Sequence, residues 1–106
     1  MKSAILSEAI TAIVEIKNFI NQHPNATFII GKTNDCLRRK EEYYKKGYNY
    51  FTPIVKLSSL EEINELEKFL ITFSKVIYQD KIENQYEGGG GNITESPNYY
   101  IYIASK

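Results

Sequence analysis

A strand followed at once by a helix, between residues 27 and 44, is the feature that most constrains this chain. Residues 27 to 30 (TFII) are β-branched or aromatic and end at Gly31, which predicts a strand and then a tight turn. A capping residue among positions 33 to 35 then starts a helix, and Gly47 suits the left-handed position that ends one. The rest of the fold has to pack around this unit.

The predicted helix carries basic side chains beside that turn. Arg38, Arg39 and Lys40 lie near its start, and Tyr43 follows Arg39 by four residues, so these two share one helix face. We interpret this face, next to Gly31, as a place to hold a phosphate or another anionic group.

Two further segments are predicted as amphipathic helices. The first covers residues 3 to 22, with Ser3 as a candidate cap, and its apolar residues repeat with helical spacing: Ile5, Ala9, Ile13, Ile16 and Ile20. The second begins after Ser58 and Ser59, each followed three residues later by a glutamate in a capping box. Its core-facing arc contains Leu60, Ile63, Leu66, Leu70, Ile71, Phe73 and Ile77. Residues 76 to 78 either prolong this helix or begin a second short one.

Glu67 falls within the apolar arc of the second helix, unlike the other acidic residues of that segment. A carboxylate on a core-facing side loses hydration free energy unless a cation or hydrogen-bond donors meet it. Glu67 is therefore expected to pair with a cation such as Arg39, to reach solvent from the edge of the arc, or to serve a functional site.

Two more strands are predicted. Residues 48 to 57 form one, and Pro53 makes it an edge strand or a bulge. Residues 99 to 104 form the other, and alternation places Tyr100 and Tyr102 on one face, opposite Tyr99, Ile101 and Ile103. So apolar a strand would aggregate at an exposed edge, and we expect it to pair beside the strand that precedes Gly31.

An aromatic cluster with interleaved lysines follows the basic helix: Tyr44, Tyr48, Tyr50 and Phe51, with Lys45 and Lys46. This composition is found on surfaces that stack on nucleic-acid bases, and also in ordinary packed strands. Packing is the preferred interpretation unless the rings prove to be exposed.

Composition limits the function classes. The 106 residues suffice for one domain, residues 1–106, and the thirteen basic residues match the thirteen acidic ones, so nucleic acid would have to bind at local clusters. Cys36 is the single cysteine, which excludes an internal disulfide and favours a reducing compartment. No apolar run approaches membrane-spanning length, so we expect a soluble intracellular protein without a membrane partner.

The spacing of Gly31, Thr33, Arg39 and Tyr43 resembles the second half of the GIY-YIG nuclease signature, with residues 29 to 31 in the place of Tyr-Ile-Gly and Cys36 in the place of a leucine. Residues 65 to 71 resemble the helix of that family in which a metal-binding glutamate lies three residues before a Leu-Ile pair. Glu67 holds that position.

The chain departs from the family pattern at both signature tyrosines. Ile29 stands where the second should be, and a helix takes the place of the first strand, which carries Gly-Ile-Tyr and pairs as a hairpin with the Tyr-Ile-Gly strand. Our hypothesis is that the C-terminal strand lies there and that Tyr100 or Tyr102 supplies the phenol. Asn92, which follows four glycines, is the candidate for the late asparagine of the family.

The resemblance implies an α+β fold with a small mixed or antiparallel three-stranded sheet flanked by helices, and a DNA endonuclease that uses one Mg²⁺. The implied catalytic residues are Arg39, Tyr43, Glu67, Asn92, Tyr100 and Tyr102, with Glu67 also the metal ligand. The implied nucleic-acid-binding residues are Gly31, Lys32, Thr33, Arg38, Lys40, Lys45 and Lys46. Two alternatives stay open: an inactive domain that binds nucleic acid or a partner protein through these basic residues, and a structural protein whose helical faces mediate homo-oligomerisation.

Overall fold

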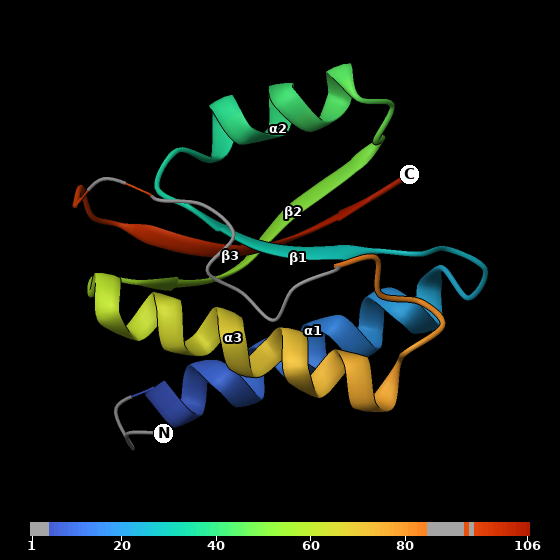
Figure 1. Cartoon of the computed structure of the whole chain (residues 1–106), viewed down its shortest axis with the longest axis horizontal. Helices are drawn as coiled ribbons and strands as arrows, with labels where there is room; N and C mark the ends of the chain where they lie inside the picture. Colours follow the sequence, from blue (N-terminus) through green and yellow to red (C-terminus); the bar gives the residue numbers. More distant parts are fainter. Residues whose placement is uncertain (1–4, 85–92, 94) are drawn as a thin grey trace.

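The computed structural model describes residues 5–84, 93 and 95–106, which form three helices and three strands (Figure 1). In chain order they are α1 (Leu6–Gln22), β1 (Ile29–Thr33), α2 (Cys36–Lys45), β2 (Tyr50–Leu57), α3 (Leu60–Ile77) and β3 (Tyr99–Ser105). The predicted α+β class is therefore confirmed. Among the described residues, no helix has the length and apolarity that crossing a membrane requires.

The C-terminal strand is the centre of the sheet. β3 lies between β1 and β2 and is antiparallel to both. Its register with β1 pairs Gly31 with Tyr102 and Thr33 with Tyr100. The prediction that this strand pairs beside the one containing Gly31 is confirmed, and its central place keeps the most apolar strand away from the edges of the sheet.

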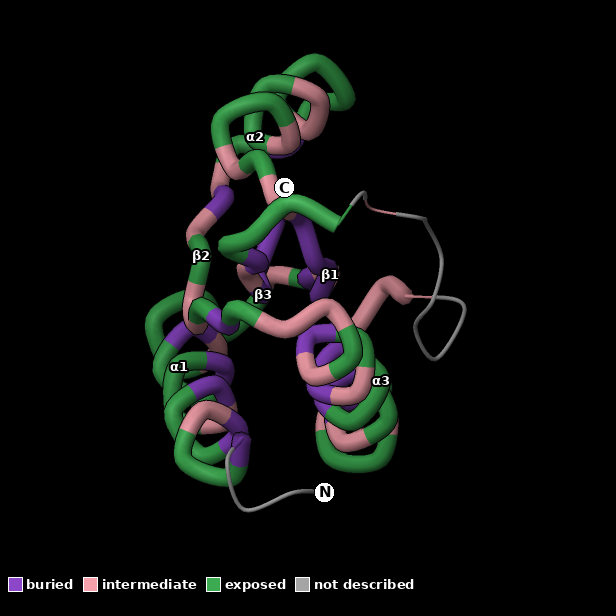
Figure 2. Tube along the Cα trace, turned by 90° about the vertical axis from the view of Figure 1, so that its left-hand side faces the viewer, coloured by how far each residue is buried: buried purple, intermediate pink, exposed green. Residues whose placement is uncertain are grey.

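The helices divide between the two faces of the sheet. Figures 1 and 2 show α1 and α3 together on one face and α2 alone on the other. The main core lies between the sheet and the α1/α3 pair, and it includes Ile101 and Ile103. A smaller cluster on the α2 side includes Tyr48, Phe51 and Tyr102. Alternation along β3 thus sends Tyr102 towards α2 and the two isoleucines towards the main core, as the sequence predicts.

The local start and stop signals act as predicted. The Asp35 carboxylate accepts a hydrogen bond from the backbone N–H of Arg38 at 3.1 Å and caps α2, and the Ser59 hydroxyl accepts one from Glu62 N–H at 3.2 Å and caps α3. Gly47 has a φ of 93°, the left-handed value expected after α2. Ile5 is the N-cap residue of α1 and provides no side-chain cap, and Ser3 lies outside the described residues.

Several predicted boundaries are wrong. β1 begins two residues later than predicted and runs through Gly31 to Thr33, because its pairing with β3 continues that far; Gly31 is therefore within the strand and not in a turn. For residues 76 to 78, the prolonged helix is the observed alternative, since α3 continues to Ile77 without a break. Ile77, which we predicted in the core-facing arc, is 55% exposed and lies outside the core. β2 begins at Tyr50, and it is an edge strand with a register shift after Pro53, as the proline predicts.

The outer edge of β1 is covered by residues 81 to 84. The backbone N–H of Phe28 donates to Lys81 O at 2.8 Å, and the backbone N–H of Glu83 donates to Phe28 O at 2.7 Å. The Asn84 side chain accepts from Ile30 N–H and donates to Ile30 O, at 2.9 and 2.8 Å. The chain after α3 is thereby tied to the strand that carries Gly31.

Candidate functional site

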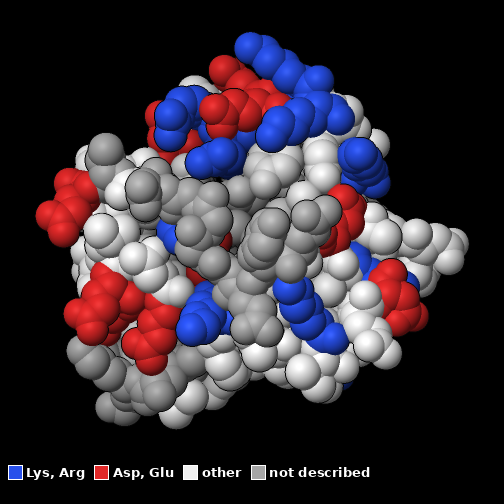
Figure 3. Space-filling model, viewed as in Figure 1, with Lys and Arg blue, Asp and Glu red and all other residues white. Residues whose placement is uncertain are grey.

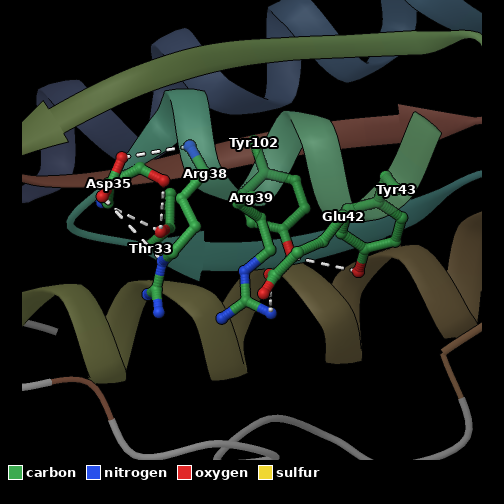
Figure 4. Close-up of polar contacts among 7 residues, drawn as sticks. All are labelled: Thr33, Asp35, Arg38, Arg39, Glu42, Tyr43 and Tyr102. Atoms are coloured by element: carbon green, nitrogen blue, oxygen red, sulfur yellow. Dashed lines mark hydrogen bonds and ion pairs between the residues drawn. The ribbon is translucent and has the colours of Figure 1, made fainter. Parts of the chain in front are cut away.

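Tyr102 lies at the centre of the α2 side of the sheet. Its side chain comes from β3, it is 3% exposed, and its ring stacks on Phe51 with a centroid distance of 4.6 Å. Its hydroxyl lies 3.0 Å from the hydroxyl of Tyr43, which α2 supplies (Figure 4). Two phenols from distant parts of the chain thus form one hydrogen-bonded pair under α2.

Gly31 provides the space for this pair. A Cβ atom at position 31 would overlap the hydroxyl oxygen and Cζ of Tyr102, the residue directly opposite on β3. The φ angle of Gly31 is not in the positive range, so a glycine is needed here for room and not for a special backbone conformation. The sequence pattern selects the right residue, but the turn that we predicted around it is absent.

Arg39 lies beside the two phenols. It shares a helix face with Tyr43, as predicted, and its side chain is 31% exposed. One guanidinium nitrogen lies 3.3 Å from a carboxylate oxygen of Glu42, while Nε is buried and has no hydrogen-bond partner among the described residues. Figure 4 shows Arg39, Glu42, Tyr43 and Tyr102 next to one another. An anion arriving from solvent could therefore meet the guanidinium only at atoms other than Nε.

The pKa of Tyr102 shows which charges surround its hydroxyl. Burial raises this pKa well above the ordinary value of 10.0, and the charge and hydrogen bond of Tyr43 raise it further. The positive charge of Arg39 lowers the pKa of Tyr102, and the negative charge of Glu67 raises it. Tyr102 therefore stays a neutral phenol at physiological pH, and the charges of Arg39 and Glu67 act on its pKa in opposite directions.

Glu67 is paired, but not with Arg39. Its Oε1 lies 2.9 Å from the Lys32 ammonium of β1, and the two side chains are only 6% (Lys32) and 8% (Glu67) exposed. Of the possibilities open for this core-facing carboxylate, pairing with a cation is the one observed, and the cation is Lys32. The suggested partner Arg39 extends from α2 and pairs with Glu42 instead. Lys32, which the sequence suggests as a nucleic-acid contact, is buried beside α3.

The side chains of this site could hold a magnesium ion only if the ion kept most of its water ligands. Within the described ranges, no three His, Cys, Asp or Glu side chains gather into a metal cluster. Mg²⁺ does not need such a cluster, because it usually keeps several waters and takes one or two carboxylates plus substrate phosphate oxygens. Glu67 would be the protein ligand, and the Lys32 ammonium on Oε1 is its competitor.

The other predicted site residues have different positions. Thr33 is fully buried, and its hydroxyl bonds to both the N–H and the C=O of Asp35, at 3.0 and 3.2 Å, which shapes the connection from β1 to α2. Tyr100 is opposite Thr33 in the sheet register and partly exposed. Exposed basic residues follow α2, where Figure 3 shows Lys and Arg gathered at the top of the molecule: Arg38, Lys40, Lys45 and Lys46. Asn92 lies outside the described residues.

Two contributors to the site were not predicted. Glu42 holds the Arg39 guanidinium, and its spacing of three residues after Arg39 on a helix is the signal that would have identified it. Phe51 supports the Tyr102 ring, and it had been predicted only as part of an aromatic cluster.

Comparison of the chain with protein-family profiles, with well-characterised proteins and with solved structures finds no match. Function is therefore inferred from the arrangement itself. A partly exposed guanidinium, two hydrogen-bonded phenols and a buried carboxylate lie around one glycine-containing strand.

Proposed function

We propose that this protein is a divergent GIY-YIG-like endonuclease that hydrolyses phosphodiester bonds of DNA with one Mg²⁺. The observation that carries the proposal is the position of Tyr102. This residue brings a phenol from the C-terminal strand over Gly31, to Tyr43 and within the electrostatic reach of Arg39 and Glu67. In the family pattern the signature tyrosines provide a phenol near an arginine and a carboxylate. Tyr102 would provide that phenol here.

The strand arrangement supports the same proposal. In the GIY-YIG family the Gly-Ile-Tyr strand pairs as a hairpin with the Tyr-Ile-Gly strand. Here β3 is antiparallel to β1 and reaches that neighbourhood from the other end of the chain. The helix α1, which stands first in the sequence, packs on the opposite face of the sheet from α2 and leaves this place free for β3 (Figure 2).

The chain's own residues have distinct roles in this proposal. Arg39 binds the phosphate through the solvent-facing part of its guanidinium and offsets the charge that grows on the phosphate oxygens. Tyr102 and Tyr43 orient the attacking water by hydrogen bonds. Because the pKa of Tyr102 is raised, this phenol positions the water and does not remove a proton from it at physiological pH.

Glu67 is the residue that would hold magnesium. A magnesium ion bound there would polarise the scissile phosphate and stabilise the leaving oxygen. The Lys32 ammonium, 2.9 Å from Oε1, holds the Glu67 carboxylate in place when no other cation is present. Lys40, Lys45 and Lys46, together with Arg38, would contact the flanking phosphates along α2.

Supercoiled plasmid incubated with the protein and Mg²⁺ tests the proposal. We expect wild type to nick the plasmid, and Arg39→Ala and Glu67→Gln to lose at least about a hundredfold in rate, the usual effect of removing one charge-stabilising group. Lys17→Ala, which removes an exposed cation of α1 on the opposite face of the sheet, is the control, and it should retain most of the activity. Equal cleavage by wild type, Arg39→Ala and Glu67→Gln purified in the same way would contradict the assignment.

A catalytically inactive domain that binds nucleic acid is the second candidate. The observation that favours it is the Lys32 ammonium on Glu67, which already neutralises the carboxylate that a metal would need. Under this candidate, wild type binds DNA through the basic residues of α2 and leaves the plasmid intact with and without Mg²⁺.

A further inference from the structure

The outward face of α2 carries two large apolar side chains. α2 lies alone on its side of the sheet and none of its residues is buried (Figure 2). Leu37 is 69% exposed and Tyr44 is 45% exposed, whereas the nearby Tyr48 and Phe51 are packed under the helix. Packing thus explains most of the aromatic cluster of this region, and it does not explain Tyr44.

Tyr44 lies in locally positive surroundings. The Lys40 ammonium is 5.4 Å from the centroid of the Tyr44 ring, within the range of a cation–π contact. Between residues 35 and 46 the acidic residues are Asp35, Glu41 and Glu42, of which Asp35 is paired with Arg38 and Glu42 with Arg39. The basic residues outnumber them: Arg38, Arg39, Lys40, Lys45 and Lys46. An exposed aromatic ring among cations suits a partner that has both flat rings and negative charge.

The candidate phosphate site is adjacent to this ring. Tyr43 and Tyr44 are consecutive, so their side chains leave the helix about 100° apart. Arg39 and Tyr43 form the face of α2 that points to Tyr102, and Lys40 and Tyr44 form the next face round the helix. Tyr44 therefore lies on the helix face that adjoins the face carrying Arg39.

We propose that Tyr44 is a stacking platform for an unpaired base, and that the substrates of this site contain single-stranded nucleotides. The flat faces of bases in a duplex are covered by their neighbours, so only an unpaired or extruded base offers a face to an exposed ring. This inference relies on the proposed function in one respect, which is that Arg39 holds a phosphate. The stacking itself requires only the exposed ring and the cations of α2.

Fluorescence anisotropy tests this inference, with a labelled oligothymidylate and a labelled duplex of the same length, at low salt and with EDTA to prevent cleavage. We expect wild type to prefer the single strand. Tyr44→Ser should weaken single-strand binding about tenfold, the size of one lost base-stacking contact, and leave duplex binding unchanged. Tyr44→Trp should keep single-strand binding, and Leu37→Ser, which removes an even more exposed apolar side chain that has no ring, should have no effect.

Other outcomes would overturn the inference. Unchanged single-strand binding by Tyr44→Ser, or equal weakening of single-strand and duplex binding, would exclude stacking at this ring. Equal losses in Tyr44→Ser and Leu37→Ser would show a general apolar surface instead. Wild type that binds duplex as tightly as single strand would overturn the inference while leaving the proposed nuclease function in place, whereas wild type that binds neither would contradict both.

Discussion

Glu67→Ala is expected to lower the free energy of unfolding by about 3–5 kcal/mol, the usual cost of removing one partner of a buried ion pair. The alanine leaves the Lys32 ammonium only 6% exposed and without the carboxylate 2.9 Å away that balances its charge. Burying an uncompensated charge costs more than the attraction that is lost. Urea denaturation followed by circular dichroism measures the difference between wild type and variant.

Replacing both residues separates two effects on the free energy of unfolding. One is the cost of burying the unpaired Lys32 charge, and the other is the contribution of the Lys32–Glu67 pair itself. Lys32→Met with Glu67→Leu removes both charges and keeps similar volumes, so it should be about as stable as wild type or more stable. Arg38→Ala breaks the exposed pair with Asp35, in which the side chains are 58% and 53% exposed, and should change stability by less than about 1 kcal/mol. A Glu67→Ala variant as stable as Arg38→Ala would show that the Lys32–Glu67 pair is not buried in solution.

Gly31→Ala is expected to destabilise the protein by about 1–3 kcal/mol and to abolish the arrangement of Tyr102. The added methyl group would overlap the end of the Tyr102 ring, and that ring is confined by Phe51 on its face and by Tyr43 at its hydroxyl. The ring must therefore leave its place, which also breaks the hydrogen bond between the two phenols. Thermal unfolding and the near-ultraviolet signal of the tyrosines report these two effects.

Two control variants test whether overlap with the Tyr102 ring is what destabilises Gly31→Ala. In a Tyr102→Ala background the ring is gone, so adding Gly31→Ala should cost little more. Gly47→Ala, at a position with a φ of 93° and no atoms near the missing Cβ, should lower stability through backbone strain without changing the site. Additive losses for Gly31→Ala and Tyr102→Ala would contradict the overlap.

Local patterns were enough to predict much of the fold. The caps at Asp35 and Ser59 and the left-handed Gly47 are decided by neighbouring residues, so they are readable from the sequence. The pairing of β3 beside β1 was also predictable, because a strand so rich in tyrosine and isoleucine would aggregate at an exposed edge. Its pairing with β2 on the other side was not predicted.

The position of Tyr102 and the partner of Glu67 depend on contacts between distant segments, so local sequence patterns could not predict them. The alternation along β3 shows that Tyr100 and Tyr102 share a face, but only the register with β1 places Tyr102 opposite Gly31. Lys32 could be recognised as the partner of Glu67 only once β1 was known to continue past Gly31, since that continuation turns Lys32 towards α3. Because the sequence predicted a turn at Gly31, neither the contact of Tyr102 with Gly31 nor that of Lys32 with Glu67 could be predicted.

The most direct test of the central claim compares Tyr102→Phe with Tyr100→Phe in single-turnover cleavage of DNA with Mg²⁺. Both residues lie on the same face of β3, but the Tyr102 hydroxyl is the one bonded to Tyr43. We predict that Tyr102→Phe, which keeps the ring and its packing, cleaves about a hundredfold more slowly or worse, while Tyr100→Phe stays near the wild-type rate. Cleavage by Tyr102→Phe at the wild-type rate, or no cleavage by wild type itself, would contradict the claim that β3 supplies the phenol of a nuclease site.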